Sequence, residues 1–145
     1  MKKKIFFGLL VVLVVIQFIR PAWNISTQTN PNEMALHYAV PDQVQAILKH
    51  SCYDCHSNNT VYPWYANIQP MGWWIQNDVN EAKHHLNFSE FGSYSPKKAK
   101  HKFEDIEDAA TNGWMPLKSY IWFHPDTKFT PEQSKLVATW AAGLK

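Results

Sequence analysis

Cysteine, glycine and the alternating apolar and polar runs of β-strands are scarce in this chain of 145 residues. Cys52 and Cys55 are the only cysteines, so the chain cannot form a four-cysteine zinc site or a network of disulfides. A β-sheet is not expected without alternating runs, and apolar residues recur with the period of an α-helix instead. The sequence predicts a small all-α domain of about four helices with long loops.

The two cysteines belong to the segment Cys52-Tyr53-Asp54-Cys55-His56. This C-x-x-C-H pattern is the attachment signature of haem c. Each thiol can add to one vinyl group of haem and form a thioether, and the histidine that follows is placed as an axial ligand of the iron. We therefore predict one covalently attached haem c, bound through Cys52, Cys55 and His56.

Other interpretations of this pattern remain open. A thioredoxin-like redox motif needs a βαβ context, of which the sequence shows no sign. A zinc site could combine Cys52, Cys55 and His56 with a distant histidine, and the two cysteines could also form a simple disulfide. Haem c is attached outside the cytoplasm, so a chain that carries it should have an export signal, and the sequence can be checked for one.

The N-terminus has the features of an export signal. Residues 2–4 are lysines, residues 5–19 are almost entirely apolar, and Arg20 follows them. A basic start before an apolar run is typical of a secretory signal. Because no small-x-small cleavage site follows cleanly, we predict an uncleaved signal anchor or transmembrane helix over residues 1–23. The positive-inside rule would keep the N-terminus in the cytoplasm, the anchor in the inner membrane and the remaining chain in the periplasm.

Charge limits the choice of partners. The whole chain has a net charge of +2, but four of its 14 basic residues lie within residues 1–20 and all 12 acidic residues lie beyond them. The exported part is therefore slightly acidic, which gives no support to nucleic-acid binding. The basic run from Lys97 to Lys102 is interpreted as a solvated helix face, or as a docking patch for an acidic redox partner.

Residues 24–41 are polar and contain Asn30-Pro31-Asn32, which indicates a linker. Residues 42–145 suit one domain. Its helices are predicted to begin at Asp42, to cover 72–86 and 96–112, and to begin again at 131. The expected capping residues are Asp42, Ser95, Gly113 and Thr130. The expected inner faces comprise Val44, Ile47 and Leu48; Trp74, Ile75, Val79, Ala82 and Leu86; Phe103, Ile106 and Ala110; and Leu136, Val137, Trp140 and Ala141.

The second axial ligand would decide what the haem does. Methionine is the usual partner of histidine in cytochromes c. Met115 lies between a glycine-containing turn and Pro116, which stiffens the backbone that presents the sulfur. We predict Met115 as the sixth ligand and Met71 as its alternative, although Met115 could also be a core residue. A bis-histidine pair would use His84 or His85. His124 is expected to bond a haem propionate or the backbone.

Five segments occur in a fixed order along the exported part: Cys-Tyr-Asp-Cys-His-Ser-Asn (52–58), Tyr-Pro-Trp-Tyr (62–65), Leu-Asn-Phe-Ser-Glu (86–90), Gly-Trp-Met-Pro (113–116) and Tyr-Ile-Trp-Phe-His-Pro (120–125). Together they resemble the bacterial haem-binding domain family over roughly residues 35–142. The order of helix, C-x-x-C-H, long insert, Gly-x-Met-Pro and final helix is also similar to class I c-type cytochromes. The family resemblance implies covalent haem on Cys52 and Cys55 and ligation by His56.

The leading hypothesis is a membrane-anchored periplasmic monohaem cytochrome that transfers single electrons to and from redox partner proteins and is not an enzyme. The first alternative is a five-coordinate haem peroxidase or gas sensor. Peroxidase chemistry needs a base and a charged stabiliser on an open distal face. No arginine follows Arg20, and no distal-pocket motif is present, which argues against it. The second alternative is a zinc-binding structural module.

Overall fold

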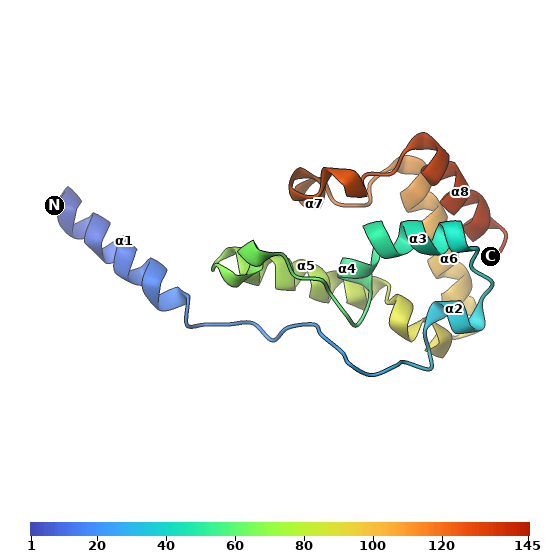
Figure 1. Cartoon of the computed structure of the whole chain (residues 1–145), viewed down its shortest axis with the longest axis horizontal. Helices are drawn as coiled ribbons and strands as arrows, with labels where there is room; N and C mark the ends of the chain where they lie inside the picture. The colour runs from blue at the N-terminus through green and yellow to red at the C-terminus, as the bar shows by residue number, and fades with distance from the viewer.

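The computed structural model describes residues 1–145, and all its regular elements are helical (Figure 1). The α-helices are α1 (Lys2–Ile16), α2 (Met34–His37), α3 (Asp42–Ser51), α4 (Tyr53–His56), α5 (Met71–His85), α6 (Pro96–Asn112), α7 (Lys118–Phe123) and α8 (Pro131–Ala142). Short 3-10 helices are η1 (Trp64–Asn67), η2 (Phe88–Ser93) and η3 (Pro125–Thr127). The predicted all-α class is confirmed. The four predicted domain helices correspond to α3, α5, α6 and α8, and the structure adds three short ones.

The predicted signals at the helix ends are present with one exception. Ser95 accepts a hydrogen bond from the backbone of the first turn of α6, and Gly113 ends that helix with a φ of 66°. Thr130 and Gln133 form a reciprocal capping box at the start of α8. The prediction that Asp42 caps α3 is wrong. Asp42 is the first helical residue and Pro41 occupies the capping position, so its carboxylate can act only on the dipole of the first turn.

The hydrophobic core lies where α3, α6 and α8 meet α2 and η2. Phe88, Phe91 and Phe103 are fully buried there, and Met34 from α2 joins them. Burying one such side chain contributes about 1.5–3 kcal/mol, so this aromatic group is the main support of the domain. The predicted inner faces of α3, α6 and α8 are confirmed: Val44, Ile47, Leu48, Phe103, Ile106, Ala110, Val137 and Ala141 are buried, and Leu136 and Trp140 pack against them.

The extended segment between α1 and α2 runs along the outside of the domain (Figure 1). The Asn24 side-chain amide donates to the Ser57 carbonyl at 2.8 Å and to Thr60 Oγ1 at 2.9 Å. Farther along, the Asn30 amide donates to Glu90 Oε1 at 2.5 Å. The predicted division into anchor, linker and domain stays a prediction, but this polar segment is bonded to the domain along its length.

The apolar N-terminal helix is shorter than predicted. α1 covers 15 residues, all its apolar side chains are exposed or half-buried, and it projects away from the domain (Figure 1). The expected anchor helix through residue 23 is not found, because the chain leaves the helix after Ile16 and Gln17 bonds to Gln69 of the domain. No helix in the structure is both long enough and apolar enough to cross a membrane.

Candidate haem-binding site

A mainly apolar cavity of about 610 Å³ adjoins the C-x-x-C-H segment. Its walls come from the helices α3 to α8. Pockets of this size bind organic ligands and cofactors. The predicted inner face after residue 72 belongs to this cavity more than to the core, since it is lined by Trp74, Ile75, Val79, Ala82 and Leu86. Trp74 is 46% exposed on this wall of the cavity.

Both cysteines are half-buried and line the cavity. Cys52 follows α3 and precedes α4, and Cys55 lies within α4, so the turn of the chain between them presents two thiols to one space. They form no disulfide. Burial, followed by the neighbouring Cys55, raises the pKa of Cys52 to about 12. Burial also raises the pKa of Cys55 to about 12, with the Asp54 carboxylate adding to the effect. Both groups are therefore neutral thiols at pH 7.

His56 is oriented by a contact with the end of α5. Its Nδ1 lies 2.9 Å from the carbonyl oxygen of Leu86. A carbonyl can only accept, so Nδ1 carries the proton and Nε2 keeps its lone pair. Burial lowers the pKa of His56, which keeps the ring neutral, and Phe88 packs edge-on against it. A neutral imidazole fixed through its other nitrogen is the form that binds metal ions.

Both candidate methionines reach the same cavity. Met115 lies in the loop between α6 and α7, and Met71 is the first residue of α5. His85 and His124 also line the cavity, whereas His84 does not. The structure thus brings Met71 and Met115 together with His56, and the choice of Met115 as sixth ligand stays a prediction.

A polar group closes one edge of the cavity. The Tyr120 hydroxyl donates to Asp54 Oδ2 at 2.7 Å, and its ring stacks on His124 with centroids 4.4 Å apart. Burial and the bonded Asp54 carboxylate raise the pKa of Tyr120. The Tyr65 hydroxyl lies 3.4 Å from Nε2 of His124. With that nitrogen as acceptor, Nδ1 of His124 carries the hydrogen, and it is buried without a partner.

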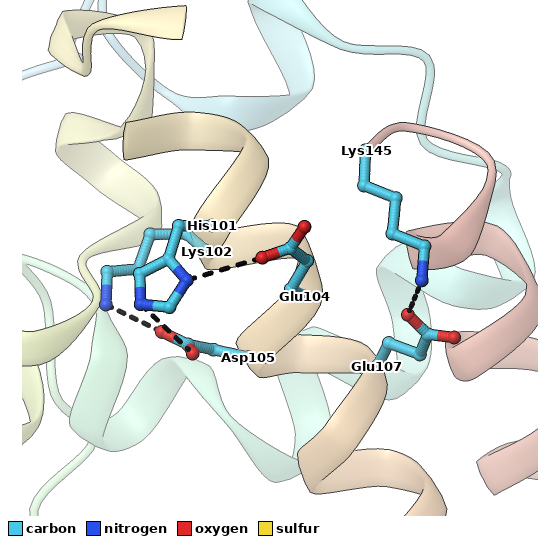
Figure 2. Close-up of polar contacts among 6 residues, drawn as sticks. All are labelled: His101, Lys102, Glu104, Asp105, Glu107 and Lys145. Carbon is cyan, nitrogen blue, oxygen red and sulfur yellow. Dashed lines mark hydrogen bonds and ion pairs between the residues drawn. The ribbon is translucent and has the colours of Figure 1, made fainter. Parts of the chain in front are cut away.

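Sequence reasoning missed two charged residues of α6 at this cavity. Lys102 and Asp105 both line it, and their side chains form an ion pair at 2.6 Å, shown with the neighbouring pairs of α6 in Figure 2. Lys97, Lys98 and Lys100 are exposed, as expected of a solvated face. The sequence did contain a signal for this placement, because residues three, four and seven positions apart share one helix face. Asp105, Ile106 and Ala109 stand at these distances from Lys102.

No pattern in the sequence predicts the hydrogen bond between Asp54 and Tyr120 either. Trp140, from the inner face of α8, does not line the cavity. Its ring meets Phe103 edge-on at 5.7 Å, and its Nε1 donates to the Ala39 carbonyl at 2.9 Å. Trp140 therefore ties α8 to the segment before α3, on the core side of the domain.

The residues present fit haem. The walls are mainly apolar, two thiols and a neutral imidazole face one space, and Nδ1 of His124 is a buried nitrogen without a partner that could bond a propionate. These features define a small all-helical haem-binding protein. The sequence profile of the haem-binding domain family matches residues 11–143, and the chain belongs to this family. Comparison with curated proteins and with solved structures gives no significant match.

Proposed function

We propose that the chain is a membrane-anchored, periplasmic monohaem c-type cytochrome that transfers single electrons between redox partner proteins and is not an enzyme. The observation that carries this proposal is the placement of Cys52, Cys55 and an oriented, neutral His56 on one apolar cavity. Bound haem would supply the one-electron couple of its iron. The protein would tether it, fix the ligand and exclude water.

Each residue has a separate task in this proposal. Cys52 and Cys55 would tether haem through two thioethers, and His56 would offer Nε2 to the iron while the Leu86 carbonyl holds its other nitrogen. Met115 would offer a thioether sulfur to the iron, and such a ligand favours the ferrous state and raises the potential. The apolar walls would keep water from the iron, and His124 would bond a propionate.

Anchoring rests on α1 and the residues around it. The lysines at positions 2–4 would remain on the cytoplasmic side, and the apolar side chains from Ile5 onward would enter the bilayer. The domain would then lie in the periplasm, where haem c is attached. The zinc alternative gains no support from the structure, which contains no group of three or more His, Cys, Asp or Glu side chains placed to hold a metal ion.

The first experiment tests covalent attachment. The full chain is produced together with a haem c maturation system, and its mass and absorption are measured after denaturation. We expect one haem to stay with the polypeptide, and we expect the double variant Cys52→Ala, Cys55→Ala to lose it. A colourless protein that contains zinc would overturn the proposal.

The second experiment tests the sixth ligand. Ferric holoprotein with methionine ligation shows a red-region band from sulfur to iron. We expect Met115→Ala to abolish that band and the matched variant Met71→Ala to keep it. The opposite pattern would assign Met71. A high-spin ferric spectrum in the unmodified protein, with ready binding of cyanide or peroxide, would instead favour the peroxidase or sensor alternative.

A further inference from the structure

The exposed large apolar side chains beyond residue 42 fall into two groups. Val61, Trp74, Trp114, Leu117 and Phe123 line the cavity, so bound haem would cover part of their surface. A second group lies outside the cavity and would stay exposed with haem in place. Its members Trp64, Ile68 and Trp122 are 76%, 49% and 79% exposed. We call these three residues the tryptophan face.

Ring contacts connect the parts of the tryptophan face. Trp64 begins η1 and meets Tyr65 edge-on at 5.8 Å. The Tyr65 ring lies 5.0 Å from Phe123, which ends α7 beside Trp122. The two exposed tryptophans, far apart in the sequence, therefore belong to neighbouring elements at one end of the domain.

Residues 17–20, which follow α1, are hydrogen-bonded to the same end of the domain. Gln17 and Gln69 are paired in both directions, because the Gln17 amide donates to the Gln69 carbonyl at 3.0 Å and the Gln69 backbone donates to Gln17 Oε1 at 2.8 Å. Arg20 donates to the Asn67 carbonyl at 3.0 Å, and Trp73 Nε1 donates to the Ile19 carbonyl at 2.8 Å. Residues 67–73, which include Ile68 of the tryptophan face, are thus bonded to residues 17–20, directly after the end of α1.

The composition of this surface suits the headgroup region of a bilayer. Residues 61–77 contain no charged residue, so placing them against lipid buries no ion. Tryptophan concentrates at membrane interfaces, where its ring is apolar and its N–H can bond. Lys118 lies one turn before Trp122 on α7, and both it and Arg20 are exposed. Such cations can meet lipid phosphates.

We propose that the tryptophan face rests on the phospholipid bilayer, so that the haem domain is held against the membrane surface beside the exit of α1. This inference rests on the membrane anchoring proposed above. A bilayer is favoured over a protein partner because the apolar side chains of α1 would enter it, and Gln17 and Arg20, which follow α1, are hydrogen-bonded to the residues on either side of Ile68.

The test uses the full-length holoprotein in phospholipid nanodiscs. Haem attachment consumes Cys52 and Cys55, so an introduced cysteine is the only free thiol and can carry a nitroxide spin label. Labels are placed by Trp64→Cys, Ile68→Cys and Trp122→Cys. Leu36→Cys is the matched control, because Leu36 is also apolar and 65% exposed but lies on α2, at the other end of the domain (Figure 1). Leu10→Cys reports on α1 itself.

Collision with oxygen, which dissolves in lipid, is compared with collision with a water-soluble nickel chelate. We expect the oxygen-to-nickel ratio at positions 64, 68 and 122 to be several-fold higher than at position 36, with an unchanged haem spectrum. Equal ratios at these positions and at 36, with a lipid value at position 10, would overturn the surface contact and leave the anchor intact. A water value at position 10 would overturn the anchoring and this inference with it. Spin–spin broadening between labels at position 64 would instead identify a second copy as the occupant.

Discussion

At the scale of single residues, burial sets the chemistry of the C-x-x-C-H segment. Reactive cysteine pairs in redox enzymes have lowered pKa values because a cation or a helix N-terminus stabilises the thiolate. Cys52 and Cys55 show the opposite shift, since burial raises the pKa of both thiols to about 12. The folded domain therefore protects these thiols instead of activating them, which speaks against a thioredoxin-like role.

This shift predicts a distinctive pH dependence of alkylation in the haem-free protein. The thiolate is the reactive form, so the rate should follow its population, rising with pH and reaching no plateau below about pH 11. The rate for the same chain in urea should be half-maximal near pH 9, the ordinary thiol value, and should be about tenfold higher or more than that of the folded protein at pH 8. The measurement is the rate of iodoacetamide labelling by mass spectrometry. A half-maximal rate near pH 9 in the folded protein would contradict the burial of the thiols.

The hydroxyl of Tyr120 gives a second prediction at this scale. Tyr120→Phe removes the bond to Asp54 and leaves a half-buried carboxylate with one donor fewer. We expect the free energy of unfolding to fall by about 1–2 kcal/mol, as measured by urea denaturation. Tyr38→Phe is the control, because the Tyr38 ring packs on Phe91 and Phe103 and its hydroxyl has no hydrogen bond in the structure. Equal effects of the two substitutions would show that the bond contributes nothing.

At the scale of elements, the end of α6 depends on Gly113. Its φ of 66° lies in the left-handed region, and a Cβ there would meet no neighbouring atom. Gly113→Ala should therefore cost only the backbone strain, about 1–2 kcal/mol of unfolding free energy. Gly143 ends α8 with a right-handed φ of −76° and room for a Cβ, so Gly143→Ala should leave stability nearly unchanged. Thermal unfolding of both variants checks the difference.

The helices differ in how well the local sequence predicts them. The helices α3, α5, α6 and α8 have apolar periods and, in part, recognisable caps, and each predicted start, together with the predicted ends of α5 and α6, lies within one residue of the observed one. The helices α2, α4 and α7 have four to six residues, too few for a period to form. Their positions depend on contacts with distant parts of the chain, such as Met34 in the core.

The residues of the candidate site also differ in how well the local sequence predicts them. Cys52, Cys55 and His56 were found from adjacent residues, because their chemistry requires a short spacing. The bond from Tyr120 to Asp54 joins residues 66 positions apart, and no local pattern encodes it. Met71 and Met115 were both named as ligands, but only the folded chain shows that both reach the cavity.

At the scale of the whole molecule, the cavity lies between elements that share a small core. The buried apolar cluster has 12 residues, whereas the cavity has a volume of about 610 Å³. Haem would replace missing contacts between α5 and α7 with apolar contacts of its own. Stability of the domain should therefore depend on haem, as it does for other ligands that bind only the folded state.

We expect the haem-free double variant Cys52→Ala, Cys55→Ala to be less stable than the holoprotein by several kcal/mol. Urea unfolding followed by far-ultraviolet circular dichroism measures the difference. The holoprotein of Met115→Ala keeps its thioethers and should lose much less. Matching unfolding midpoints for the double variant and the holoprotein would show that the domain does not need its cofactor to be stable.

The chain between α1 and the domain has a consequence for how electrons could reach the haem. Four residues between Gln17 and Asn24 are hydrogen-bonded to the domain, namely Gln17, Ile19, Arg20 and Asn24, so this short stretch is fixed to it. A cytochrome on a loose tether can swing between a donor and an acceptor. In the anchored cytochrome that we propose, the domain would keep one orientation to the bilayer, and carriers would have to come to the haem.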